Sequence, residues 1–221
     1  MTFRGIIFDM DGTLLDSMGM WTSIDRRFLL SHGIEPPADI SDIVGKMTIE
    51  QACAYYAETF PLGLTPQEVG DEIERMAERA YRQELPLKPH AKEFLSELNR
   101  REIPCVLCSV TYRNLLEAAL IRLGIADCFR AVLSSEEKAE GKHTPALYLR
   151  AAALIGAEPQ QIIVIEDALY AARTAKAAGF YTVGFREPVS AADWDTLAGV
   201  CDRVTDSWAE LDTPAFYSQF E

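Results

Sequence analysis

Five short apolar runs constrain the fold of this chain most strongly. They are rich in Ile, Val, Leu or Cys, and polar residues do not alternate with apolar ones within them. A run that is apolar on both faces is typical of a strand in a parallel sheet that is covered by helices on both sides. We therefore expect strands at residues 5–8, 105–108, 131–133, 162–165 and 181–184.

Helical patterns separate these runs. Thr144 is expected to be the N-cap of a helix whose first residue is Pro145, and the alanine-rich segment 168–178 is expected to end as a helix at Gly179. Strands that alternate with helices indicate an α/β fold with a doubly wound parallel sheet. The sequence thus predicts a Rossmann-like core.

The segment from Ser17 to about Leu87 follows a different pattern. It contains no strand-like run, and the sequence Thr65-Pro66-Gln67-Glu68 has the form of a capping box followed by apolar residues at helical spacing. We predict an inserted all-helical cap domain at residues 17–87, a core domain made of residues 1–16 and 88–221, and a hinge at residues 86–89.

Charge and composition exclude several classes of function. The chain has 34 acidic and 21 basic residues, a net charge of −13, which argues against binding to nucleic acid. No apolar run approaches the roughly 20 residues that cross a membrane. The five scattered cysteines suit a reducing compartment. We expect a cytoplasmic protein that binds neither nucleic acid nor membrane and acts as a monomer or a weak homodimer.

Residues that carry chemistry follow the predicted strands. Because the carboxyl ends of parallel strands open on one crevice, we expect four carboxylates, one lysine and one hydroxyl to converge there. Carboxylates a few ångströms apart repel one another unless protons or a cation join them, and all-oxygen ligands favour Mg²⁺. Gly12 permits a sharp turn that presents backbone N–H groups to an anion. The converging residues are Asp9, Asp11, Ser109, Lys142, Glu166 and Asp167.

Four of these segments resemble the motifs of one family. Asp9-Met10-Asp11-Gly12-Thr13-Leu14-Leu15-Asp16-Ser17 resembles the first motif of haloacid dehalogenase-like (HAD) phosphohydrolases, and Ser109 stands where the second motif has Ser or Thr. Gly141-Lys142-His143-Thr144-Pro145 is similar to the third motif, usually Gly-Lys-Pro-x-Pro, and Glu166-Asp167 to the fourth. The helical insertion resembles the cap of the β-phosphoglucomutase-like subfamily.

The resemblance implies roles for the acidic residues. Asp9 attacks phosphorus and becomes an aspartyl phosphate, and it also contacts the metal ion. Asp11 protonates the leaving alcohol and then activates water, while its backbone carbonyl binds Mg²⁺. Asp167 binds Mg²⁺ directly and Glu166 does so through water. Such a site agrees with phosphoryl transfer, which depends on alignment and charge neutralisation.

The resemblance also implies a phosphate-binding set. Ser109 and the Val110 N–H bind phosphate oxygens, and Lys142 offsets negative charge on Asp9 and on the phosphoryl group. Gly12 belongs to the same set through its turn. Arg113 is a further candidate, with a solvated arginine at a helix start as the equal alternative.

Several reactions remain open at this level. We expect a Mg²⁺-dependent phosphatase of small phosphorylated metabolites, with sugar phosphates as one option. A β-phosphoglucomutase-type phosphotransferase is the first alternative, but Trp21 and Thr48 stand where such mutases carry a cap histidine and an arginine. Lys46 lies two positions from the place of a phosphonatase lysine. The alternative from another class is a phospho-receiver signalling module, which also groups acidic residues, a hydroxyl and a lysine around Mg²⁺.

Overall fold

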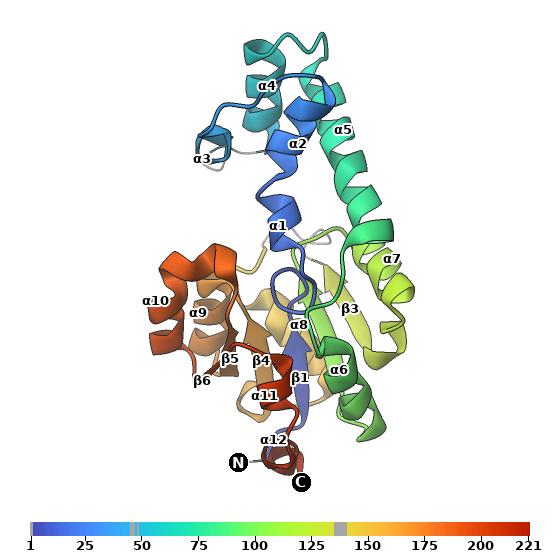
Figure 1. Ribbon diagram of the computed structural model, residues 1–221. Coiled ribbons are helices and arrows are strands. Elements are labelled where there is room, and N and C mark those ends of the chain that lie inside the picture. The colour runs from blue at the N-terminus through green and yellow to red at the C-terminus, as the bar shows by residue number, and fades with distance from the viewer. Residues whose placement is uncertain (1, 45–46, 48, 135–140) are drawn as a thin grey trace. The chain divides into compact units, whose positions relative to one another are not determined.

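The computed structural model describes residues 2–44, 47, 49–134 and 141–221. The chain forms two compact units, and each is described by itself. The first consists of Met1–Asp16 and Leu85–Glu221, and the second of Ser17–Glu84. The first unit is built on a six-stranded, fully parallel sheet with the order β3-β2-β1-β4-β5-β6 (Figure 1). The α/β doubly wound fold predicted from the sequence is confirmed.

All five predicted strands are present. Four of them are one residue longer than the predicted runs, since each includes the next residue along the chain. These residues are Ser109, Ser134, Glu166 and Phe185. A sixth strand at the sheet edge was missed, since it has only three residues and two of them are only half-buried. The strands are β1 (Gly5–Phe8), β2 (Cys105–Ser109), β3 (Ala131–Ser134), β4 (Ile162–Glu166), β5 (Tyr181–Phe185) and β6 (Arg203–Thr205).

Helices cover both faces of the sheet. On one face, Ile7 of β1 and Val164 of β4 are buried in a cluster with side chains of α8 and α9. On the other face, the Phe8 ring contacts the rings of Phe94 on α6 and Trp208 on α11, with centroids 6.3 and 5.7 Å away. Side chains of β1 are therefore buried on both faces of the sheet, which explains why its sequence shows no polar alternation. The helices of this unit are α6 (Ala91–Arg100), α7 (Arg113–Leu123), α8 (Ala146–Ile155), α9 (Leu169–Ala177), α10 (Trp194–Val200), α11 (Trp208–Leu211) and α12 (Pro214–Tyr217).

The predicted end of one helix is confirmed, and the predicted start of another is wrong. Helix α9 stops at Ala177, and Gly179 follows with φ +92°, a backbone conformation that favours glycine. The expected start of α8 was wrong by one residue. The Pro145 carbonyl accepts the first intrahelical bond from the Leu149 N–H (2.9 Å), so Pro145 rather than Thr144 is the N-cap.

The described residues of the second unit form helices joined by loops, with no strand among them. Its core gathers aromatic and aliphatic side chains, with Phe28 and Tyr56 fully buried and their rings 5.5 Å apart. The Tyr56 hydroxyl donates to Asp25 (2.6 Å), which lies at the edge of that core. The elements are α1 (Met18–Trp21), α2 (Ile24–Ser31), α3 (Ile40–Val44), α4 (Ile49–Thr59), α5 (Pro66–Arg79) and the π-helical turn η1 (Ala80–Glu84).

The chain returns to the first unit after Glu84, whereas the sequence pattern placed the return after Leu87. Backbone contacts explain the difference. Leu87 forms an isolated bridge with Leu15, the Asp16 N–H donates to the Pro86 carbonyl (3.0 Å), and the Lys88 N–H donates to the Leu14 carbonyl (2.8 Å). The return segment thus pairs with the end of the first-motif loop.

The predicted capping box at the start of α5 is confirmed. The Thr65 side chain accepts from the Glu68 N–H (3.3 Å), and the Glu68 carboxylate accepts from the Thr65 N–H (2.8 Å). We expect Thr65→Ala to lower the local stability of α5 by about 1 kcal/mol, because a backbone donor at the helix start loses its partner. Hydrogen exchange of the α5 amides measures this effect. Thr59→Ala, at the exposed end of α4, is the control, and equal losses in the two variants would contradict the capping role.

Candidate active site

The sheet topology brings the ends of β1 and β4 together. Chain order reverses at this pair, since β2 and β3 lie beyond β1 while β5 and β6 lie beyond β4. Asp9 directly follows β1, and its N–H donates to the Ile165 carbonyl (3.1 Å) on β4. Glu166 is the last residue of β4, and Asp167 comes next. Ligands of open α/β sheets bind at such a switch point.

Asp9, Glu166 and Asp167 form a buried acidic triad. One carboxylate oxygen from each lies within 4.8 Å of the others, and no other group of this kind occurs among the described residues. The three residues are 6%, 1% and 4% exposed. The Oε2 atom of Glu166 is buried without a hydrogen-bond partner. A small divalent cation fits this donor set, because it would supply the missing partner and neutralise the clustered charge.

Burial controls the protonation of the triad. It raises the pKa of Asp9 above the ordinary value, with Lys142 opposing the shift and the neighbouring Asp11 adding to it. Burial likewise raises the pKa of Glu166 to about 7. The pKa of Asp167 lies well above its usual range, through burial and the charges of Asp9 and Glu166. Three charged carboxylates are therefore costly here without positive charge beside them.

Lys142 supplies part of that positive charge. Its side chain is buried and donates to Asp9 and to Glu166 Oε1, the latter at 2.6 Å. Burial lowers the pKa of Lys142, but the two carboxylates outweigh it, so the pKa lies above the ordinary value. The contact with Asp9 is the one that the predicted charge-offsetting role of Lys142 requires, and that role stays a prediction. The lysine follows the third strand and reaches the ends of β1 and β4.

Two further hydroxyls hold the triad in place and were missed by the sequence analysis. The Tyr148 hydroxyl donates to Glu166 Oε1 (2.6 Å), and the Thr13 hydroxyl donates to Asp167 Oδ1 (3.0 Å). Thr13 lies within the first motif, so its position offered a signal. Tyr148 lies among apolar residues on the buried face of α8 and is fully buried. A tyrosine on such a face needs a partner for its hydroxyl, which was the available signal.

Asp11 lies beside the triad without joining it. Its carboxylate accepts from the Thr111 hydroxyl (2.7 Å), and its charge contributes to the raised pKa of Asp9. Thr111 follows β2, and its carbonyl accepts from the Ser134 hydroxyl (2.7 Å) at the end of β3. The Asp11 side chain is thereby held by the β2 loop, and neither Thr111 nor Ser134 was predicted.

The predicted phosphate-binding residues are arranged around the end of β2 and the first-motif loop. Ser109 is buried, and its hydroxyl oxygen accepts from the Thr111 N–H (3.1 Å). Val110 is half exposed. Gly12 has φ +80°, as a sharp turn requires, but its own N–H donates to the Leu15 carbonyl (3.0 Å), so that N–H is used within the loop.

Arg113 begins α7 and forms an ion pair with Glu117 one turn further along the helix (3.5 Å). Its side chain is 37% exposed. This contact fits the alternative of a solvated arginine at a helix start.

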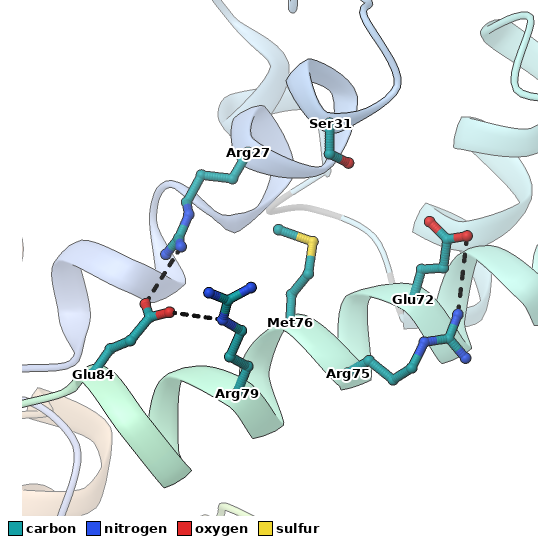
Figure 2. A pocket seen from close by; sticks show the side chains of 7 residues that line it. All are labelled: Arg27, Ser31, Glu72, Arg75, Met76, Arg79 and Glu84. Carbon is teal, nitrogen blue, oxygen red and sulfur yellow. Dashed lines mark ion pairs between the residues drawn. The ribbon is translucent and has the colours of Figure 1, made fainter.

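A large cavity lies elsewhere, in the helical unit. It has a volume of about 610 Å³ and is bordered mainly by α2 and α5 (Figure 2). Arg27 and Arg79 both pair with Glu84, at 3.5 and 3.3 Å, and Arg75 pairs with Glu72 at 3.9 Å. None of the residues predicted for the active site lines this cavity. Each of its three arginines pairs with one of its two glutamates, all within the helical unit.

The fold and the buried centre define a class: an α/β enzyme with an acidic, lysine-bridged site at the switch point of a parallel sheet. The model of the haloacid dehalogenase-like hydrolase family matches residues 3–179, and the chain belongs to this family of hydrolases. The resemblance seen in the four sequence motifs is therefore confirmed.

Individual relatives support the same assignment. The chain is 26% identical to hexitol phosphatase B of Escherichia coli K12, over 85% of each chain. It is 28% identical to the fructose-1-phosphate phosphatase of the same strain, covering 83% of this chain and 97% of the relative. The crystal structure of a β-phosphoglucomutase homologue from Thermotoga maritima shares the fold, with a TM-score of 0.81 at 20% identity, covering 92% of this chain and 94% of that one. Within the described residues, no helix has the length and apolar character needed to cross a membrane.

Proposed function

We propose that this protein is a Mg²⁺-dependent phosphatase that hydrolyses small phosphomonoesters, among them sugar phosphates, through an aspartyl-phosphate intermediate. The observation that carries the proposal is the contact of Lys142 with both Asp9 and Glu166 inside the buried acidic triad. The names of the curated relatives, phosphatases of hexitol phosphates and of fructose 1-phosphate, support the substrate class.

Asp9, Glu166, Asp167 and the backbone carbonyl of Asp11 would hold Mg²⁺, which when bound supplies positive charge against the carboxylates and the phosphoryl oxygens. Lys142 keeps Asp9 charged, as a nucleophile must be. Asp9 is buried, so its carboxylate does not have to shed a shell of water before it attacks phosphorus.

The reaction has two steps. In the first, an Asp9 carboxylate oxygen forms a bond to phosphorus while the bond from phosphorus to the ester oxygen breaks, and Asp11 gives a proton to the departing alkoxide. In the second, Asp11 takes a proton from water, whose oxygen attacks phosphorus. The bond to Asp9 then breaks and inorganic phosphate leaves. Ser109 and the Val110 N–H bind phosphoryl oxygens, and Thr111 holds Asp11 in position through its hydroxyl (2.7 Å).

The helical unit serves as the cap of this enzyme. Its place in the chain supports the role, because it begins directly after the loop that carries Asp9 and Asp11 and returns before β2. A cap that closes over the substrate excludes bulk water and admits only small esters. The cytoplasm is the proposed compartment, supported by five cysteines that all remain thiols.

Hydrolysis is favoured over the mutase reaction by one observation in the helical unit. Trp21, at the place of the mutase histidine, donates from its indole nitrogen to the Tyr81 hydroxyl (3.1 Å). An indole nitrogen neither loses nor gains a proton near neutral pH, so it cannot replace a histidine in acid–base catalysis. Lys46 and Thr48, which bear on the phosphonatase and mutase alternatives, lie outside the described residues.

The test is phosphate release from p-nitrophenyl phosphate and a panel of sugar phosphates. With Mg²⁺ we expect many turnovers per enzyme, and with EDTA a loss of more than about 100-fold, since the metal contributes several kcal/mol of charge stabilisation. Added Mg²⁺ should restore the rate. Isomer interconversion without net phosphate release would instead identify a mutase, and a single stoichiometric phosphorylation would identify a receiver module. Either result would overturn the proposal.

A further inference from the structure

Exposed apolar side chains gather at the carboxyl edge of the sheet. Among the described residues, eight large apolar side chains are exposed, and four of them lie within four positions of a strand's carboxyl end. Single exposed apolar residues are ordinary, but a concentration at the edge that holds the active site indicates contact with a ligand. The four are Val110 and Tyr112 after β2, Tyr170 after β4 and Val189 after β5.

Tyr170 is the member of this group nearest to the proposed chemistry. It lies in the first turn of α9, three positions after Asp167, and it is 40% exposed. Its ring stacks on the imidazole of His143, with centroids 4.5 Å apart and an angle of 25° between the planes. His143 directly follows Lys142. The stacked pair thus joins the two segments that supply the lysine and the acidic residues.

The electrostatic surroundings of Tyr170 agree with this placement. Burial raises the pKa of its hydroxyl, Lys142 opposes the shift, and the charges of Glu166 and Asp9 add to it. The charges of the centre therefore act on the Tyr170 hydroxyl. The side chain is not part of the acidic triad and is not among the buried core residues.

We propose that Tyr170 and His143 form a subsite for the alcohol part of the substrate, and that this subsite selects phosphate esters of cyclic sugars over those of open-chain polyols. The proposal rests on the phosphatase function given above. A stacked pair of rings presents a flat apolar surface. A pyranose ring offers a matching face of C–H groups in one fixed conformation, whereas an open chain must give up rotational freedom to present one.

The expected size of the preference follows from the contact. Aromatic packing contributes about 0.5–1.5 kcal/mol beyond the buried area, which corresponds to a factor of up to about ten in kcat/KM. Specificity between two substrates is the ratio of their kcat/KM values, so this ratio is the quantity to measure. A substitution that slows the chemical step equally for both esters leaves this ratio unchanged.

The experiment compares glucose 6-phosphate with glucitol 6-phosphate, and mannose 6-phosphate with mannitol 6-phosphate, all with Mg²⁺. Each pair has the same six carbons and the same phosphate position, and differs in ring against open chain. We expect the native enzyme to prefer the ring in each pair. Tyr170→Ala should lower the ring-to-chain ratio by about tenfold and His143→Ala by about threefold, since the imidazole acts as the second layer of the stack.

Two controls keep the test sharp. Tyr170→Phe retains the ring and should keep the ratio within about twofold of the native value. Ile121→Ala removes the most exposed of the eight apolar side chains, 72% exposed on α7, and should leave the ratio unchanged. An equal fall for both members of each pair in Tyr170→Ala, or a native preference for the open chains, overturns the subsite. Absence of phosphate release from every ester would overturn the phosphatase function instead.

Discussion

Replacement of Asp9 by Asn is expected to lower kcat for phosphate release by at least about 10⁴-fold, the scale seen when an enzyme loses its nucleophile. The amide has nearly the shape of the carboxylate, but it carries no charge and attacks phosphorus poorly. The substitution also removes one member of the buried triad and leaves Lys142 with Glu166 as its remaining partner. The fold should therefore persist, and the loss should be a loss of chemistry.

Asp16→Asn is the matched control for this variant. The same change of chemical group occurs at an exposed position near the end of the first motif, where we expect full activity. Single-turnover experiments with each purified variant and Mg²⁺ separate the chemical step from product release. If Asp9→Asn retained more than about a tenth of the native rate, the nucleophile would have to be another residue.

The strands and the main site residues could be predicted from the sequence for the same physical reason. A central strand such as β1 is buried on both faces, so its run of apolar residues is continuous and its end is marked by the first polar residue, Asp9. Glu166 is found in the same way at the end of β4. Because the strands are parallel, their polar carboxyl ends lie at the same edge of the sheet. The proximity of Asp9 and Glu166 therefore follows from the predicted fold.

The residues that were missed depend on contacts between distant segments. Tyr148 reaches Glu166 from the first turn of α8, and Thr111 reaches Asp11 from the neighbouring strand end. A pattern within one segment gives no information on such pairing. Strand β6 was missed because an edge strand of three residues buries too little to need an apolar run. The turn at Gly12 was predicted to present backbone N–H groups to an anion, and the contact of the Gly12 N–H with the Leu15 carbonyl within that turn could not be read from the sequence.

The second large effect is expected from Lys142→Met. It removes the positive charge that contacts both Asp9 and Glu166 and leaves these two carboxylates buried beside Asp167. Breaking a buried ion pair by removing one partner typically costs about 3–5 kcal/mol of unfolding free energy. We expect a loss of this size in EDTA, measured by urea unfolding with tryptophan fluorescence, since Trp194 and Trp208 both belong to the first unit.

Magnesium should reduce that loss, because a bound cation takes over part of the compensation that Lys142 provides in its absence. Activity should still fall strongly, since Mg²⁺ does not replace the contact that keeps Asp9 charged. Lys176→Met is the control: Lys176 pairs with Asp202 at the surface, where such pairs contribute about 1 kcal/mol or less. Equal destabilisation of the two variants, or a Lys142→Met deficit that Mg²⁺ leaves untouched, would mean that Lys142 and the metal ion do not neutralise the same carboxylates.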